Sequence, residues 1–159
     1  MQINNILRPE LVIHNADLGS KQQVLQQISV LLCSCNTFLN TADVFNNLLK
    51  REYLCSTGLG HGIAIPHCRS ENIKEPVACL LSLKNTVQFN NETAYDKQLV
   101  KLVFGLVVPE ENHKKHLELL AELAGLLDNE KIRTNLHNAK NATELFELLS
   151  SADNKAIYS

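Results

Sequence analysis

A nearly continuous apolar segment at residues 99–108 constrains the fold of this chain more than any other feature. Because its apolar residues do not alternate with polar ones, a strand formed here must be buried on both faces of a sheet. Pro109 follows the segment and is expected to end the strand. The segment therefore predicts a buried strand in an α/β fold whose sheet is flanked by helices on both faces.

Helical and strand patterns alternate along the rest of the chain. The segment from Ser20 to Cys33 begins with the spacing of a capping box and continues with apolar residues at helical intervals. A second helix is expected from Asn40 or Thr41 to about Glu52. The other expected elements are strands at residues 63–65 and 77–83 and helices at residues 110–127, 131–136 and 141–149.

The chain has 159 residues, the size of one ordinary domain. It contains no internal repeat, low-complexity tract or Gly/Ser linker that would divide it. We expect a single α/β domain over residues 1–150, followed by a mobile polar tail at residues 151–159.

Charge and cysteine content limit the partners and the location of the protein. Its 15 Lys and Arg against 17 Asp and Glu give a net charge of -2, too weak a field to hold nucleic acid unspecifically. The apolar runs are far shorter than the roughly 20 residues that a bilayer span needs, and the N-terminus lacks a signal-peptide pattern. An odd number of cysteines, 5, favours a reducing compartment. We expect a cytoplasmic protein that binds neither nucleic acid nor membranes; the oligomeric state stays open.

A glycine-rich segment precedes the most promising histidine. Gly58, Gly60 and Gly62 stand at alternate positions and predict a tight loop with exposed backbone N–H groups. The short strand that follows must end at Pro66, because proline cannot donate to a ladder. His67 is thus expected at the rim of the sheet, where functional residues are often found. A purely structural histidine at a strand end remains the alternative.

Two further residues are expected near His67. His116 shares one helix face with the leucines four, seven and eleven residues later, so it should point inward and need a polar partner. Arg51 lies a few residues before the glycine loop, and its guanidinium group suits a phosphate or a carboxylate. By contrast, His14, His113 and His137 are expected to be solvent-exposed.

The segment Arg51–His67, with the sequence REYLCSTGLGHGIAIPH, resembles the signature of IIA proteins of the fructose/mannitol class in the phosphoenolpyruvate-dependent sugar phosphotransferase system. It is most similar to their free-standing nitrogen-regulatory branch. The similarity begins near Ser20 and continues through Asp96, LVFGLVVP at 102–109 and HLELL at 116–120, so it covers nearly the whole chain. It implies an α/β fold with a mixed sheet between helices.

The resemblance also implies roles for the three candidate residues. His67 would accept a phosphoryl group from the phosphohistidine of HPr or of its nitrogen-branch relative. His116 would form a hydrogen bond near the imidazole or the phosphoryl group, and Arg51 would stabilise the charge. Two positions differ from the usual pattern: His61 stands where relatives often have Asn, and Cys68 follows His67 where Gly is usual.

Transfer of a phosphoryl group between two imidazoles needs an uncharged attacking nitrogen, in-line approach and donors for the spread negative charge. No nucleotide, metal or other cofactor is required. The glycine loop is expected to bind the phosphate oxygens through its backbone N–H groups, as a nest does. Its residues are Ser56, Thr57, Gly58, Gly60 and Gly62.

Three functions follow as hypotheses. The first is a phosphotransferase component that signals to regulatory target proteins by its phosphorylation state, in nitrogen, potassium or carbon metabolism as the branch resemblance implies. The second is a sugar-specific IIA component that passes the phosphoryl group to a IIB subunit. The third, of another class, is a metal-binding module that uses Cys55, His61, His67 and Cys68, all of which are residue types that ligate soft metals.

Overall fold

The structure is a computed structural model that describes residues 2–91 and 93–158, with side chains described up to residue 155. Strand β6 lies inside the sheet, and every residue from Leu102 to Pro109 on it is buried, as the apolar segment predicted. The elements are η1 (Ile3–Asn5), β1 (Leu7–Ala16), α1 (Lys21–Ser34), α2 (Thr41–Leu54), β2 (Gly58–Gly60), β3 (Ile63–Ala64), β4 (His67–Ser70), β5 (Val77–Gln88), β6 (Leu99–Pro109), α3 (His113–Leu127), α4 (Glu130–His137) and α5 (Ala142–Tyr158).

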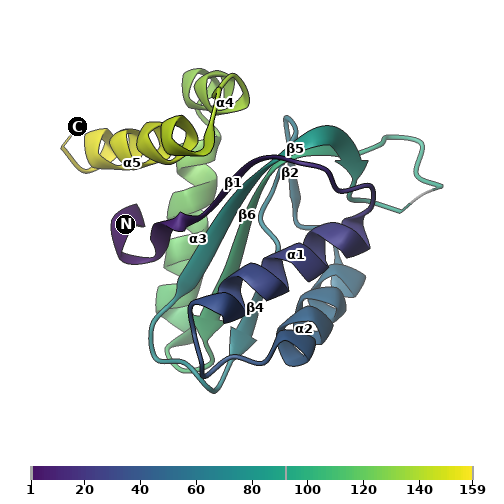
Figure 1. Cartoon of the computed structure of the whole chain (residues 1–159), viewed down its shortest axis with the longest axis vertical. Helices are drawn as coiled ribbons and strands as arrows, with labels where there is room; N and C mark the ends of the chain where they lie inside the picture. The colour runs from purple at the N-terminus through teal and green to yellow at the C-terminus, as the bar shows by residue number, and fades with distance from the viewer. Residues whose placement is uncertain (1, 92, 159) are drawn as a thin grey trace.

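The described strands form one mixed sheet in the order β1-β5-β6-β3-β2, and β4 also pairs with β6. Strands β3 and β4 run parallel to β6, β5 runs antiparallel to it, and β1 runs parallel to β5. Figure 1 shows α1 and α2 side by side on one side of the sheet, and α3, α4 and α5 on the other. The predicted α/β fold with a mixed sheet between helices is confirmed.

Gly105 lets helix α1 pack closely against the centre of the sheet. A Cβ atom at this position would lie 2.7 Å from Ile28 Cγ2 and 2.8 Å from Cys79 Sγ, closer than side-chain atoms can pack. The glycine inside a strand therefore serves the close approach of a neighbouring helix.

The predicted helix starts are confirmed where a side chain caps them. Ser20 Oγ accepts a hydrogen bond from the backbone N–H of Gln23 at 3.2 Å, and Asn40 Oδ1 accepts one from Asp43 at 3.1 Å. The start of α3 differs from the expectation, since the helix begins at His113 rather than at Glu110. The reason is that the Glu110 N–H still donates to the Ser70 carbonyl at 2.9 Å, which extends the strand pairing beyond Pro109.

Three strands were not predicted, and one of them, β2, lies in the glycine segment that was expected to be a loop. Strand β1 contains Pro9 and two charged residues, which obscure its pattern; the proline is tolerated because β1 is at the edge of the sheet. Strand β4 is short and has only one fully buried residue, Cys68. His67 consequently begins a strand, whereas the sequence placed it just after the end of one.

The expected mobile tail is wrong for the residues that the structure describes. Helix α5 continues through Tyr158, and Ser159 lies outside the described residues. Asp153, only 3% exposed, accepts a hydrogen bond from the Ile3 N–H at 2.7 Å. This bond ties the last helix to the first residues of the chain.

Candidate functional site

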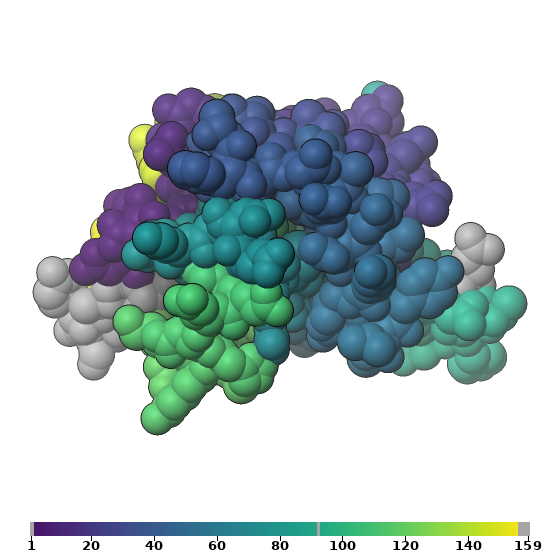
Figure 2. Space-filling view, turned by 90° about the horizontal axis from the view of Figure 1, so that it is seen from below, coloured from purple at the N-terminus to yellow at the C-terminus, as the bar shows by residue number. Residues whose placement is uncertain are grey.

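An open groove of about 1140 Å³ lies where α2, β4, the end of β6 and the start of α3 meet. His67, His116 and Arg51 all line it. Figure 2 shows this end of the molecule, where a hollow separates α2, in blue, from the start of α3, in green. The structure therefore brings the three predicted residues into one groove, from three different elements.

The imidazole of His67 has a defined orientation. The residue is half-buried, and its Nδ1 lies 2.8 Å from the carbonyl oxygen of Ile65. Because a carbonyl oxygen can only accept, Nδ1 carries the proton and donates, which leaves the lone pair on Nε2. The ring thus presents one unprotonated nitrogen.

Burial is the main cause that lowers the pKa of His67 below its ordinary value of 6.5. The hydrogen bond to Ile65 acts in the opposite direction, while the positive charge of Arg51 lowers the pKa further. The ring is therefore uncharged at neutral pH, the state that nucleophilic attack requires.

His116 faces inward, as the helical pattern predicted, and is 7% exposed. Its Nδ1 is buried and has no hydrogen-bond partner among the described residues. Burial lowers the pKa of His116, and the positive charge of Arg69 adds to the effect. A buried nitrogen without a hydrogen-bond partner is costly, which singles out His116 as a candidate functional residue.

Arg51 lies in the last turn of α2, where its Nη1 donates a hydrogen bond to the Cys55 carbonyl oxygen at 2.8 Å. This bond holds the guanidinium group over the end of the helix, beside the groove. Since a guanidinium has five N–H donors, others remain for an anion in the groove.

Glu52 anchors the end of α2 and was not predicted. It is 8% exposed, forms an ion pair with Lys21 Nζ at 2.6 Å, and accepts hydrogen bonds from the N–H of Thr57, at 3.2 Å, and from its hydroxyl. A signal was present in the sequence, because Glu52 lies four and eight residues after Leu48 and Val44, on the buried face of the helix.

The groove also contains Arg69 and His113, which the sequence analysis did not connect with the site. His113 is exposed, as predicted, and its Nε2 lies 3.3 Å from Arg69 Nη2. Arg69 was overlooked because β4 was not predicted, so the alternation that places residues 67 and 69 on one face could not be used.

The glycine segment forms the β2–β3 hairpin, with positive φ at Gly60, His61 and Gly62. Among the described residues, none of the five predicted to bind phosphate lines the His67 groove. The N–H of Thr57 donates to Glu52, and that of Gly58 donates to Ser56 Oγ at 3.1 Å.

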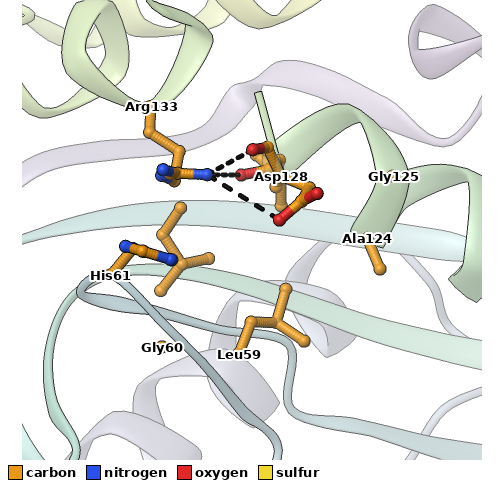
Figure 3. A pocket seen from close by; sticks show the side chains of 9 residues that line it. Leu59, Gly60, His61, Ala124, Gly125, Asp128 and Arg133 are labelled. Carbon is orange, nitrogen blue, oxygen red and sulfur yellow. Dashed lines mark hydrogen bonds and ion pairs between the residues drawn. The ribbon is translucent and has the colours of Figure 1, made fainter. Parts of the chain in front are cut away.

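The tip of the hairpin instead borders a separate pocket of about 320 Å³. Figure 3 shows Gly60 and His61 there, together with Asp128 at the end of α3 and Arg133 from α4. Arg133 Nη1 donates to the carbonyl oxygens of Leu127 and Asp128, which caps the end of α3. This side of the hairpin therefore packs against helices rather than facing the groove.

The metal-binding alternative finds no support in the arrangement of side chains. In residues 2–91 and 93–158, no group of three His, Cys, Asp or Glu residues could hold a metal ion. Burial also raises the pKa of the Cys68 thiol to about 12, which disfavours the thiolate that a metal would need. In the same described ranges, no helix is long and apolar enough to cross a bilayer.

Comparison with known proteins gives one coherent result. A family model described as "Phosphoenolpyruvate-dependent sugar phosphotransferase system, EIIA 2" matches residues 5–152. The chain is 38% identical over 154 residues to the nitrogen regulatory protein of Pseudomonas aeruginosa, a match that covers 97% of this chain and 98% of that protein.

Solved structures agree. The crystal structure of the nitrogen regulatory protein IIA-Ntr from Neisseria meningitidis superposes with a TM-score of 0.83 at 35% identity, covering 94% of this chain and 99% of that one. Enzyme IIA mannitol from Escherichia coli, in its complex with phosphorylated enzyme IIB mannitol, gives a TM-score of 0.75 at 20% identity, covering 92% and 99%. The second similarity supports the fold alone.

Proposed function

The chain belongs to the EIIA 2 family of the phosphoenolpyruvate-dependent sugar phosphotransferase system, and on this premise we propose that it is a regulatory phosphocarrier that accepts a phosphoryl group on His67. Its family membership agrees with the resemblance found in the sequence. The observation that carries the proposal is the orientation of His67, whose Nδ1 donates to Ile65 and whose Nε2 is left with a lone pair beside an open groove.

In the proposed reaction, the Nε2 lone pair attacks the phosphorus atom of a phosphohistidine on an HPr-like donor. The N–P bond of the donor breaks and its electron pair returns to the donor imidazole, so one N–P bond replaces another. The proton on Nδ1 stays in place. As the His67 ring becomes positively charged, its bond to the Ile65 carbonyl oxygen strengthens, because hydrogen bonds from charged donors are the stronger ones.

Arg51 and His116 are proposed to act on the transferred group. The Arg51 guanidinium group would stabilise the negative charge on the phosphoryl oxygens. His116 would supply a hydrogen bond to the phosphoryl group or to the ring of His67. The loop N–H groups are not part of this proposal, because their residues do not line the groove.

The regulatory role is favoured by the relatives that match this chain over nearly its whole length and are named nitrogen regulatory proteins. Under this proposal, target proteins in the cytoplasm respond to the phosphorylation state. A second candidate is transfer to a IIB component, which is suggested by the fold shared with enzyme IIA mannitol in its complex with phosphorylated IIB.

The test is incubation with phosphoenolpyruvate, enzyme I and an HPr-like phosphocarrier, followed by intact mass measurement. We expect the wild type to gain one acid-labile phosphoryl group and His67→Ala to gain none. His14→Ala is the matched control, since this histidine lies outside the groove. A phosphoryl group that persists in His67→Ala would remove His67 as the acceptor, and rapid onward transfer to a IIB protein would favour the second candidate.

A further inference from the structure

Arg69 shares the groove face of β4 with His67. The two residues are two positions apart in one strand, so their side chains project to the same side, and both line the groove. Cys68 between them is only 6% exposed, whereas Arg69 is exposed. The backbone of β4 therefore directs a guanidinium group into the groove beside the candidate phosphoryl acceptor.

The contacts of Arg69 leave it available for an anion. Its Nη2 lies 3.3 Å from Nε2 of His113, and because a guanidinium only donates, the His113 nitrogen must be the acceptor and its ring uncharged. Within the described residues, no carboxylate forms an ion pair with Arg69. A neutral imidazole is a weaker partner for a cation than a charged oxygen would be.

The charge of Arg69 also reaches both histidines of the site. It contributes to lowering the pKa of His67 and, after burial, is the next cause for the lowered pKa of His116. Arg51 approaches from α2, whereas Arg69 approaches from β4, so a group bound on His67 would have a cation from each of two elements.

We infer that Arg69 is a second phosphoryl-binding arginine of this site, and that His113 positions its guanidinium group at the edge of the groove until a phosphoryl group is bound. This inference rests on the proposed function of His67. When a dianionic phosphoryl group is on His67, its oxygens replace the neutral His113 nitrogen as acceptors, because charge-assisted hydrogen bonds are stronger. His113 acts only through Arg69.

The experiment measures single-turnover phosphoryl transfer from the HPr-like donor at several donor concentrations. We expect Arg69→Ala to lower the maximal rate by about 10- to 100-fold and Arg69→Lys by less, while the half-saturating donor concentration changes little. A normal maximal rate with a higher half-saturating concentration would show that Arg69 only docks the donor, and would overturn the inference.

His113 is tested by a double-mutant cycle. We expect His113→Ala to slow transfer less than Arg69→Ala, and the double variant to be no slower than Arg69→Ala alone, since His113 acts through Arg69. Additive losses would contradict the positioning role. The matched control is Arg8→Ala, which removes the same charge from an exposed site outside the groove and should transfer at the wild-type rate.

A separate measurement distinguishes failure of this inference from failure of the proposed function. Inorganic phosphate is titrated into wild type and Arg69→Ala while the ring resonances of His67 are followed by NMR. Phosphate-induced shifts that weaken in Arg69→Ala support an anion site that includes Arg69, even if wild type accepts no phosphoryl group. Identical phosphate-induced shifts in the two proteins, or no shift in the wild type, would overturn the inference. Thermal unfolding checks that the variants are folded.

Discussion

At His67, the backbone carbonyl of Ile65 decides which ring nitrogen can react. The residue type alone permits either nitrogen to be the nucleophile, but the 2.8 Å contact places the proton on Nδ1. The chain reaches this geometry because Pro66 separates the hairpin strand from β4 and offers no N–H of its own. The reactive atom is thus selected by main-chain geometry two residues away.

Arg51→Ala is expected to slow phosphoryl transfer by about 100-fold, the loss typical for one preorganised donor to a developing charge. Its stability should change little, because within the described part of the chain the Arg51 side chain donates a single hydrogen bond, to a carbonyl oxygen at an exposed site. Quenched-flow transfer rates and thermal unfolding check the two parts. A wild-type rate in Arg51→Ala would remove the residue from the site. The control is Lys50→Ala, which removes a positive charge from the preceding residue, also on the groove, and so shows the effect of charge alone.

The pH dependence of stability follows from the two groove histidines. Both have a pKa in the folded state below the ordinary 6.5, chiefly because of burial. Between the folded and unfolded pKa values the unfolded chain binds more protons, so the free energy of unfolding decreases as the pH falls below about 6.5. Urea unfolding across pH 5 to 8 should show a smaller decrease in the variant His67→Gln/His116→Gln than in wild type.

The variant His14→Gln is the control for this measurement, because His14 lies away from the groove. The same slope in wild type and in the double variant would show that neither groove histidine is deprotonated by folding. The comparison between chains is needed because many carboxylates also titrate at the acidic end of the range.

Among the elements, α2 carries the clearest link between structure and site. It supplies Arg51 to the groove on one side and, one residue later, Glu52 to the interior on the other. The Glu52 carboxylate joins the end of α2 to the start of α1 through Lys21 and to the following loop through Thr57. The orientation of Arg51 therefore depends on a buried ion pair outside the groove.

We predict that Glu52→Ala destabilises the protein by about 3 kcal/mol or more, because it leaves the partly buried Lys21 ammonium group without its counter-ion. Glu52→Gln keeps one acceptor oxygen and should cost about 1 to 2 kcal/mol. Urea unfolding midpoints measure both. Glu147→Ala, an exposed glutamate on α5, is the matched control, and equal midpoints for the Glu52 and Glu147 variants would contradict the anchoring role.

For the whole molecule, the junction of the two chain ends contributes to stability. Asp153 from α5 accepts the Ile3 N–H, and Ile3 itself is 1% exposed. Helix α5 also packs along β1, as Figure 1 shows, so the last helix completes one side of the sheet. Ala152 and Asp153, in the segment that the sequence assigns to a tail, belong to this packing.

Deletion of residues 151–159 is accordingly expected to lower the free energy of unfolding by at least about 2 kcal/mol, since it leaves a buried backbone N–H without an acceptor. Asp153→Asn is a narrower test of the same bond and should cost about 1 to 2 kcal/mol. Asn154→Ala, at an exposed position of the same helix, serves as the control. An unchanged unfolding midpoint after the deletion would show that the junction contributes nothing.

Local patterns predicted much of this architecture. Three features could be predicted because each depends only on residues within one element. They are the apolar run of β6, the caps of α1 and α2, and the inward orientation of His116. Strand β1 could not be predicted, since a proline and charged residues at a sheet edge hide the period that identifies a strand. Strand β4 could not be predicted because it is too short to show that period. Arg69 was missed for the same reason.

The order of residues alone therefore determined the α/β class, the family and the identity of three groove residues, because these depend on periodicity and on a long contiguous motif. Only the tertiary structure decided which His67 nitrogen is free, that Arg69 and His113 share the groove, and that the glycine hairpin turns toward α4 instead. The physical reason is that these features depend on contacts between segments far apart in the chain, whose distances no local pattern contains.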